Sequence, residues 1–348
     1  SEMCIRDRDR ISRKWLIVGS LFVWSAVTFL MGYATSFEQL YGLRAVMGVS
    51  EALYIPSALS LIADWHQDKS RSLAIGVHMT GLYVGQAIGG VGATAAAAFF
   101  WQSTFHWFGI VGIAYSVVLI FFLHENPIRM KIEKVVVSGV SKGDSIGKGL
   151  LLLFSNISFW VILFYFAAPS LPGWATKNWL PTLFAENLDI PMSQAGPIST
   201  ITIALSSFVG VILGGFLSDR WVLKNIRGRV YTGAIGLGMT IPALLLLGFG
   251  HGFVSVIGAG LLFGVGFGIF DANNMPILCQ FVSAKYRGTA YGIMNMTGVF
   301  AGAAVTQLLG KWTDGGSLGE GFAMLSIVVA LALGLQLYLL RPKTDNME

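Results

Sequence analysis

The sequence has little charge and almost no cysteine. Only 12% of its 348 residues are Asp, Glu, Lys or Arg, about half the roughly 25% found in ordinary soluble domains. The two cysteines, Cys4 and Cys279, lie far apart, and neither stands beside histidines at metal-ligand spacing. A disulfide framework and a zinc site are therefore not expected. The low charge excludes a water-soluble enzyme, and we predict no metal and no cofactor.

Strand patterns are also missing, and no soluble domain separates the hydrophobic segments. Hydrophobic residues make up 54% of the chain, no stretch alternates with the period of two that strands require, and a transmembrane helix needs about 20 apolar residues. We therefore predict an all-α membrane protein with ten spans. The ten apolar stretches are 15–33, 40–63, 75–98, 107–123, 157–184, 195–217, 231–249, 254–278, 290–309 and 322–340.

Basic residues are concentrated in alternate loops. Of the 23 Lys and Arg residues, 20 precede the first stretch or follow the second, fourth, sixth, eighth and tenth. The positive-inside rule assigns these loops to the cytosol. We expect a multi-pass protein of the plasma (inner) membrane with both chain ends cytosolic. The net charge of +5 therefore reflects orientation in the lipid bilayer, and no nucleic-acid partner is expected.

The two parts of the chain repeat one another. A shift of 220 residues carries one set of four residues onto a second set with identical spacing, Gly48, Glu51, Ala52 and Pro56 onto Gly268, Asp271, Ala272 and Pro276. This pattern is typical of parallel repeats related by an axis along the membrane normal.

Applied backwards, the repeat carries the fifth and sixth spans to positions before residue 1. We therefore expect a first half that lacks its first two helices, although a genuine ten-span protein is an alternative. The predicted divisions are an unrelated leader at 1–8, a truncated bundle at 9–124 holding helices 3–6, a cytosolic linker at 125–149 and a six-helix bundle at 150–348.

Four ionisable residues, Arg44, Glu51, Lys177 and Asp271, fall inside apolar stretches. Each costs about 2.5–3.5 kcal/mol on insertion scales and is a functional candidate. Arg44 and Glu51 share one helix face at heights about 10 Å apart. A guanidinium suits a carboxylate substrate, and a desolvated carboxyl suits a group that binds and releases a proton. Structural pairing of both with neighbouring helices is the alternative.

Other polar residues are candidates with open alternatives. Asp271 is equivalent to Glu51 in the repeat and is either a second proton site or a neutral hydrogen-bonded residue beside Asn274. Lys177 can simply extend to the membrane interface. Pro169, Pro172 and Gly173 predict a break in the 157–184 helix, and such a break should line the pathway. The substrate-binding candidates are Arg44, Tyr165, Asn295, Gln86 and Asn274.

The loop after the sixth span carries a motif. Residues 214–220, Gly-Gly-Phe-Leu-Ser-Asp-Arg, are followed by Arg227 and Arg229. In the first half, Asp9, Arg10, Arg13 and Lys14 look like the tail of the same motif. These residues resemble the major facilitator superfamily, whose members have twelve helices in two parallel six-helix halves. The resemblance implies that fold here, with ten of the twelve helices present.

The same resemblance implies a cytosolic gate. Each motif carboxylate would clamp the start of the fifth helix of the opposite half, Asp9 against Gly288 and Thr289, and Asp219 against Ser72. Solvated loop charges are the alternative. The residues predicted for the gate are Asp9, Arg10, Arg13, Arg71, Asp219, Arg220 and Arg287.

Further residues narrow the resemblance to the anion:cation symporter branch, which includes carriers for hexuronates, galactonate, sialic acid and tartrate. They are the Trp-Leu-Pro-Thr sequence at 179–182, Asn295, and the spacing of Arg44, Glu51 and Pro56. The resemblance implies that Arg44 binds the substrate carboxylate and that Glu51 couples the proton. Leu53 departs from the family, in which proline is frequent at this place.

We therefore predict a monomeric proton symporter that imports a small organic anion, such as a sugar acid, by alternating access. Two alternatives stay open: an anion exchanger or exporter on the same scaffold, and a non-transporting sensor or scaffold. Dependence on an internal counter-anion would favour exchange, and absent substrate binding would favour a sensor. Enzymatic activity is not expected, because no nucleophile, base and orienting group converge at recognisable spacing.

Overall fold

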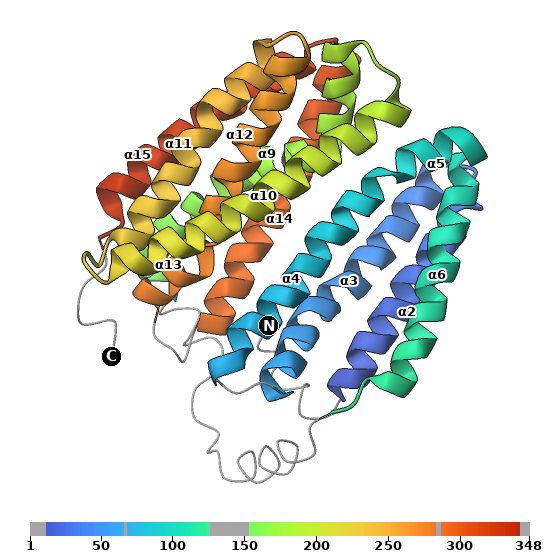
Figure 1. The fold of residues 1–348 in the computed structure, drawn as a ribbon, viewed down its shortest axis with the longest axis horizontal. Coiled ribbons are helices and arrows are strands. Elements are labelled where there is room, and N and C mark those ends of the chain that lie inside the picture. The colour runs from blue at the N-terminus through green and yellow to red at the C-terminus, as the bar shows by residue number, and fades with distance from the viewer. Residues whose placement is uncertain (1–11, 66–67, 126–152, 283–286, 342–348) are drawn as a thin grey trace. The chain divides into compact units, whose positions relative to one another are not determined.

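The computed structural model describes residues 12–65, 68–125, 153–282 and 287–341, and all regular structure in these ranges is helical. The predicted leader at 1–8 and nearly all of the predicted linker at 125–149 lie outside them. The helices in Figure 1 are α2 (Arg13–Met31), α3 (Phe37–Trp65), α4 (Asp68–Gly90), α5 (Gly92–Phe99), α6 (Trp101–Phe122), α9 (Ile157–Leu188), α10 (Met192–Val222), α11 (Gly228–Phe249), α12 (Phe253–Asp271), α13 (Asn274–Phe281), α14 (Arg287–Asp314) and α15 (Leu318–Leu339).

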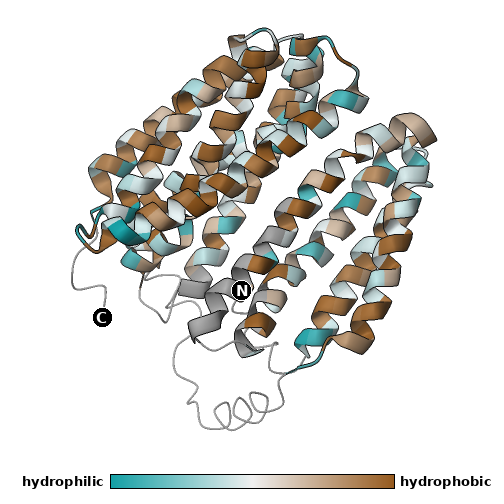
Figure 2. Ribbon diagram, in the orientation of Figure 1, coloured by the Kyte–Doolittle hydropathy of each residue, from teal (hydrophilic) through white to brown (hydrophobic). Residues whose placement is uncertain are grey.

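Each of the ten predicted stretches lies on one helix or on a consecutive pair, α4 with α5 and α12 with α13. Within the described ranges, 8 segments are long and apolar enough to cross a membrane, and α12 with α13 forms one of them. Helix α3 is not among them, although it is 29 residues long. Hydrophobic residues run along the helices, whereas the turn between α10 and α11 is hydrophilic (Figure 2). The all-helical membrane fold is confirmed.

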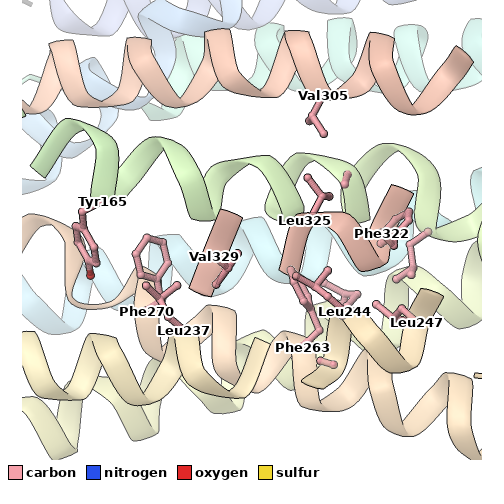
Figure 3. Close-up of a cluster of buried hydrophobic side chains, with 14 of the residues drawn as sticks. Tyr165, Leu237, Leu244, Leu247, Phe263, Phe270, Val305, Phe322, Leu325 and Val329 are labelled. Carbon is pink, nitrogen blue, oxygen red and sulfur yellow. The ribbon is translucent and has the colours of Figure 1, made fainter. Parts of the chain in front are cut away.

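The chain forms two compact units. Unit 1 comprises Ser1–Leu82 and Gly92–Gly143, and unit 2 comprises Tyr83–Val91 and Asp144–Glu348. In unit 1, α2 packs against both α3 and α6. In unit 2, α9 to α15 enclose a large hydrophobic core that includes Phe263, Phe270 and Phe322 (Figure 3). The core of unit 2 therefore supplies the rigid frame for the polar residues of its helices.

Glycines bring the helices of unit 2 into close contact. Helix α12 packs against α10 and α11, and a Cβ on Gly236 of α11 would lie 2.5 Å from the Gly266 carbonyl oxygen and 2.7 Å from the Phe270 nitrogen. Such approaches increase van der Waals contact where the lipid itself gives no hydrophobic driving force for helix association.

We expect Gly236→Ala to destabilise the protein by about 1–3 kcal/mol, because the methyl group has no space beside α12. The matched control is Gly238→Ala on the same helix, where a Cβ would meet nothing within 4 Å. Thermal unfolding in detergent should show a lower melting temperature for the first variant alone. Equal melting temperatures for the two variants would contradict this packing.

The predicted break in the fifth apolar stretch is wrong. Helix α9 runs without interruption over 32 residues and contains Pro169, Pro172 and Pro181. Proline removes one backbone donor, but nearby hydroxyls bond to helix carbonyls. The Ser170 hydroxyl donates to the Phe166 oxygen over 2.6 Å, and the Thr176 hydroxyl donates to the Gly173 oxygen over 2.9 Å. Local side-chain bonding of this kind allows proline within a membrane helix.

An interruption occurs in a different span, between α12 and α13. Helix α12 ends at Asp271, and α13 begins at Asn274. Pro276 has no amide hydrogen for the carbonyl of Ala272 four residues earlier. The buried Asn273 side chain donates to the Ile269 oxygen over 2.8 Å. This turn places Asp271 at a helix end.

Candidate functional site

In unit 1, Arg44 and Glu51 are both exposed on α3. They lie seven residues apart, nearly two turns, and so share one side of the helix. The neighbouring side of α3 holds the buried Ser50 and Leu61, and α3 packs against α2. Ala58, seven residues after Glu51, is buried as well. A cation and an acid are thus presented together along the edge of a helix that is otherwise largely apolar.

An aromatic group that the sequence analysis missed stands one turn from Glu51. The Tyr54 ring lies 5.7 Å from the Trp24 ring of α2 and 6.0 Å from the His78 ring of α4, measured between centroids. The imidazole Nε2 of His78 is buried and has no hydrogen-bond partner among the side chains that the structure describes. The spacing of three residues between Glu51 and Tyr54 is the sequence signal that could have identified this neighbourhood.

In unit 2, the turn between α12 and α13 joins two predicted site residues. The buried side chain of Asn274 donates its Nδ2 hydrogen to Oδ1 of Asp271 over 3.1 Å. Asp271 itself is exposed at the end of α12, and Asn295 of α14 is half-buried. Gln86 of α4, which belongs to the segment grouped with unit 2, is half-buried.

Lys177 contributes a cation to the same unit. Its Nζ lies 5.0 Å from the centroid of the Trp174 ring, an arrangement in which the aromatic face attracts the ammonium. Lys177 is exposed and lies within electrostatic range of Asp271. Two residues of α9 connect this region to α14, since Asn178 donates to the Thr306 hydroxyl over 2.9 Å and Trp179 donates to the Thr306 carbonyl over 3.1 Å.

Tyr165 does not lie with the exposed polar residues. Only 1% of its surface is exposed, and its ring packs edge-on against Phe270 with centroids 5.2 Å apart. Figure 3 shows Tyr165 extending from α9 into the interior near Phe270. This position does not favour direct contact between Tyr165 and a substrate.

The motif at the end of α10 forms local contacts. Oδ1 of Asp219 lies 3.7 Å from Nη2 of Arg229, and the Asp219 side chain is 79% exposed. The Arg220 guanidinium lies 4.7 Å from the centroid of the Phe216 ring. Arg227 donates to the Leu337 carbonyl over 2.5 Å. The motif therefore ties the α10–α11 turn to the end of α15.

The other predicted gate residues fall at or beyond the edges of the described ranges. Arg13 is the first residue of α2. Asp9 and Arg10 lie outside the described residues, and the side chains of Arg71 and Arg287 lie outside them as well. The proposed clamps with Ser72, Gly288 and Thr289 are thus left as predictions.

A contact that the sequence did not predict lies at the start of α2 in unit 1. Oε1 of Glu125 accepts hydrogen bonds from the Ser12 hydroxyl over 2.6 Å and from the Lys14 backbone over 2.9 Å. A carboxylate at a helix N-terminus accepts hydrogen bonds from free amide groups and interacts favourably with the positive end of the helix dipole. Glu125 thereby fastens the chain after α6 to the start of α2.

Within the ranges that the structure describes, no group of three or more His, Cys, Asp or Glu side chains is arranged to hold a metal ion.

Comparisons with known proteins agree on the class of protein. The family model described as Major Facilitator Superfamily matches residues 8–307. A D-galactonate transporter from Escherichia coli is 24% identical, and the match covers 93% of this chain and 79% of that protein. A probable sulfoacetate transporter from Cupriavidus necator is 27% identical, with 81% of this chain and 67% of that protein covered.

Solved structures share the fold. A bacterial homologue of the human lysosomal transporter Spinster, in an inward-facing and unoccupied conformation, superposes with a TM-score of 0.77 at 17% sequence identity. This match covers 97% of the present chain and 85% of the Spinster homologue. The occupied inward-facing structure gives a TM-score of 0.74.

Proposed function

The chain belongs to the Major Facilitator Superfamily and is a secondary transporter rather than an enzyme, and we propose that it imports a small organic anion together with a proton. The observation that carries this proposal is the presence of Arg44 and Glu51 on one side of α3, both exposed. In a membrane helix such charges are costly and are retained where they bind or move an ion.

The chemistry of the two groups differs. The planar guanidinium of Arg44 offers two parallel hydrogen bonds to a carboxylate or sulfonate. Glu51 accepts a proton in one state and releases it in the next. We place Asp271, with its Asn274 partner, as a second group in proton coupling, and Lys177 and Asn295 as residues that contact the substrate. Gln86 retains its proposed substrate role.

Two relatives support an organic anion as the substrate. One is named a D-galactonate transporter and another a probable sulfoacetate transporter. D-galactonate carries one carboxylate, and sulfoacetate carries a carboxylate and a sulfonate. One guanidinium can bind an acidic group of either compound. The transporter is proposed to work as a monomer in the plasma (inner) membrane, with its basic loops on the cytosolic side.

The anion class can be tested by ligand-induced stabilisation of the full-length protein. A ligand that binds only the folded protein raises its melting temperature, and at 100 times its Kd the stabilisation is about 2.7 kcal/mol. D-galactonate, related sugar acids and sulfoacetate should raise the melting temperature, whereas uncharged D-galactose should not. Stabilisation by the uncharged sugar but by none of the acids would contradict the proposal.

We propose that Asp219 acts in the cytosolic gate and contributes little to the stability of the folded protein. Because its carboxylate is largely exposed, the pair with Arg229 contributes about 0–1 kcal/mol to folding. We expect Asp219→Asn to leave the melting temperature almost unchanged and to slow uptake of D-galactonate. Glu320→Gln, in the first turn of α15, is the matched control. Unchanged uptake by Asp219→Asn would remove the gate role.

A further inference from the structure

Unit 2 contains buried oxygen atoms that have no hydrogen-bond partner among the residues that the structure describes. They come from side chains that are at most 4% exposed, and they belong to α9, the α12–α13 turn, α13 and α15. In the described part of unit 2 these oxygens are Oη of Tyr165, Oδ1 of Asn273, Oδ1 of Asn274, Oε1 of Gln280 and Oε1 of Gln336.

The orientation of the amide groups follows from their nitrogen atoms. Nδ2 of Asn273 donates to the Ile269 carbonyl, Nε2 of Gln280 donates to the Ile226 carbonyl over 3.0 Å, and Nε2 of Gln336 donates to the Val230 carbonyl over 2.7 Å. Since a carbonyl can only accept, the nitrogen must face it in each case. The remaining oxygens are therefore true acceptors, and no donor in the described part of the chain reaches them.

These groups extend along α13 from Asp271 towards the α10–α11 turn. Residues 273 and 280 are separated by about 10 Å along the helix axis. At one end Asn274 donates to Asp271, and at the other Gln280 is bonded to Ile226 in the turn. The polar groups thus connect a carboxylate inside the span with the basic end of unit 2.

Tyr165 stands beside this series. Its hydroxyl oxygen lies 2.8 Å from the position that a Cβ on Gly233 would occupy, and Nε2 of Gln336 lies 3.3 Å from the same point. A Cβ on Gly233 would therefore collide with the Tyr165 hydroxyl, and the missing side chain lets Tyr165 and Gln336 approach the same point of α11.

Buried polar atoms need hydrogen-bond partners, and buried water commonly supplies them where several polar groups surround a small space. A cation site would need about six oxygens converging on one point at about 2.4 Å. Acceptors spread over about 10 Å of helix instead match a row of water molecules.

We propose that these side chains hold a file of water that carries protons between Asp271 and the α10–α11 turn. The inference rests on the proposed proton coupling. The proton leaves the Asp271 carboxyl group, which becomes a carboxylate, and passes from one water to the next. The Tyr165 hydroxyl accepts one proton and donates its own, so that its charge is restored. The amides orient the water and transfer no proton.

The test compares net uptake with exchange in liposomes that contain the full-length protein. Tyr165→Phe removes the hydroxyl and keeps the buried ring. Net D-galactonate uptake driven by a proton gradient should slow by about 100-fold or more, the low end for loss of a positioned proton-transfer group. Exchange of labelled for unlabelled D-galactonate, which needs no proton release, should stay within about twofold of the unmodified protein. Tyr338→Phe, on the exposed side of α15, is the matched control and should alter neither rate.

A second variant displaces the hydroxyl without removing it. Gly233→Ala places a Cβ 2.8 Å from the Tyr165 hydroxyl oxygen, so that the hydroxyl must shift, and should slow net uptake more than exchange. Unchanged net uptake in Tyr165→Phe would overturn the water file, and so would an equal loss of exchange, because that result indicates a binding or structural role. If the unmodified protein shows no proton-driven uptake, the proposed function itself fails. If the unmodified protein shows proton-driven uptake and Tyr165→Phe shows the same uptake, only the proposed water file is contradicted.

Discussion

We expect Glu51→Gln to abolish accumulation of D-galactonate against its gradient. Glutamine keeps the size and hydrogen-bonding capacity of a protonated Glu51 but cannot release a proton. A difference of one pH unit supplies about 1.4 kcal/mol per proton, enough for about tenfold accumulation at a ratio of one proton per anion. The variant should therefore equilibrate the anion and accumulate none.

The measurement is uptake into liposomes with and without a proton gradient, together with exchange. Exchange should persist in Glu51→Gln, because the neutral side chain mimics the loaded state. Glu38→Gln, in the first turn of the same helix, is the control and should accumulate the anion normally. If Glu51→Gln still concentrates the anion in response to the gradient, Glu51 has no role in coupling.

We expect Arg44→Ala to lose affinity for D-galactonate by about 100-fold or more. Each hydrogen bond to a charged group contributes about 1.5–3 kcal/mol, and a bidentate contact has two. Arg44→Lys should restore binding only in part, because an ammonium keeps the charge but lacks the planar pair of donors.

Affinity can be measured by titration calorimetry on the purified protein. Arg341→Ala, at an exposed position after α15, is the control for loss of a positive charge. It should bind the anion as the unmodified protein does. Equal affinity in Arg44→Ala and Arg341→Ala would exclude Arg44 from the binding site.

The sequence predicted the helices well, because hydropathy and the loop distribution of Lys and Arg follow directly from the membrane environment. It was wrong about prolines. Pro169 and Pro172 lie inside a continuous α9, whereas α12 ends five residues before Pro276. Hydroxyl and amide side chains near the prolines bond to the carbonyls of Phe166, Gly173 and Ile269, and a hydropathy profile contains no such information.

The candidate site was predictable in part. Charged residues in an apolar stretch identified Arg44, Glu51 and Asp271, and the structure describes all three as exposed. The burial of the Tyr165 side chain against Phe270 was not predictable. Helix α9 packs against several neighbouring helices, and the sequence does not show which of them each polar side chain faces. The contact between Glu125 and the start of α2 joins residues 111 and 113 positions apart, and it depends on tertiary packing alone.

The central claim is that anion and proton cross together, and it is tested by following both fluxes in liposomes that contain the unmodified protein. Labelled D-galactonate added outside, without any imposed proton gradient, should enter and carry protons with it, so that a pH dye enclosed in the liposomes reports acidification. A proton ionophore should abolish the acidification. Anion entry with no acidification, or entry that requires a second anion inside the liposome, would contradict the account.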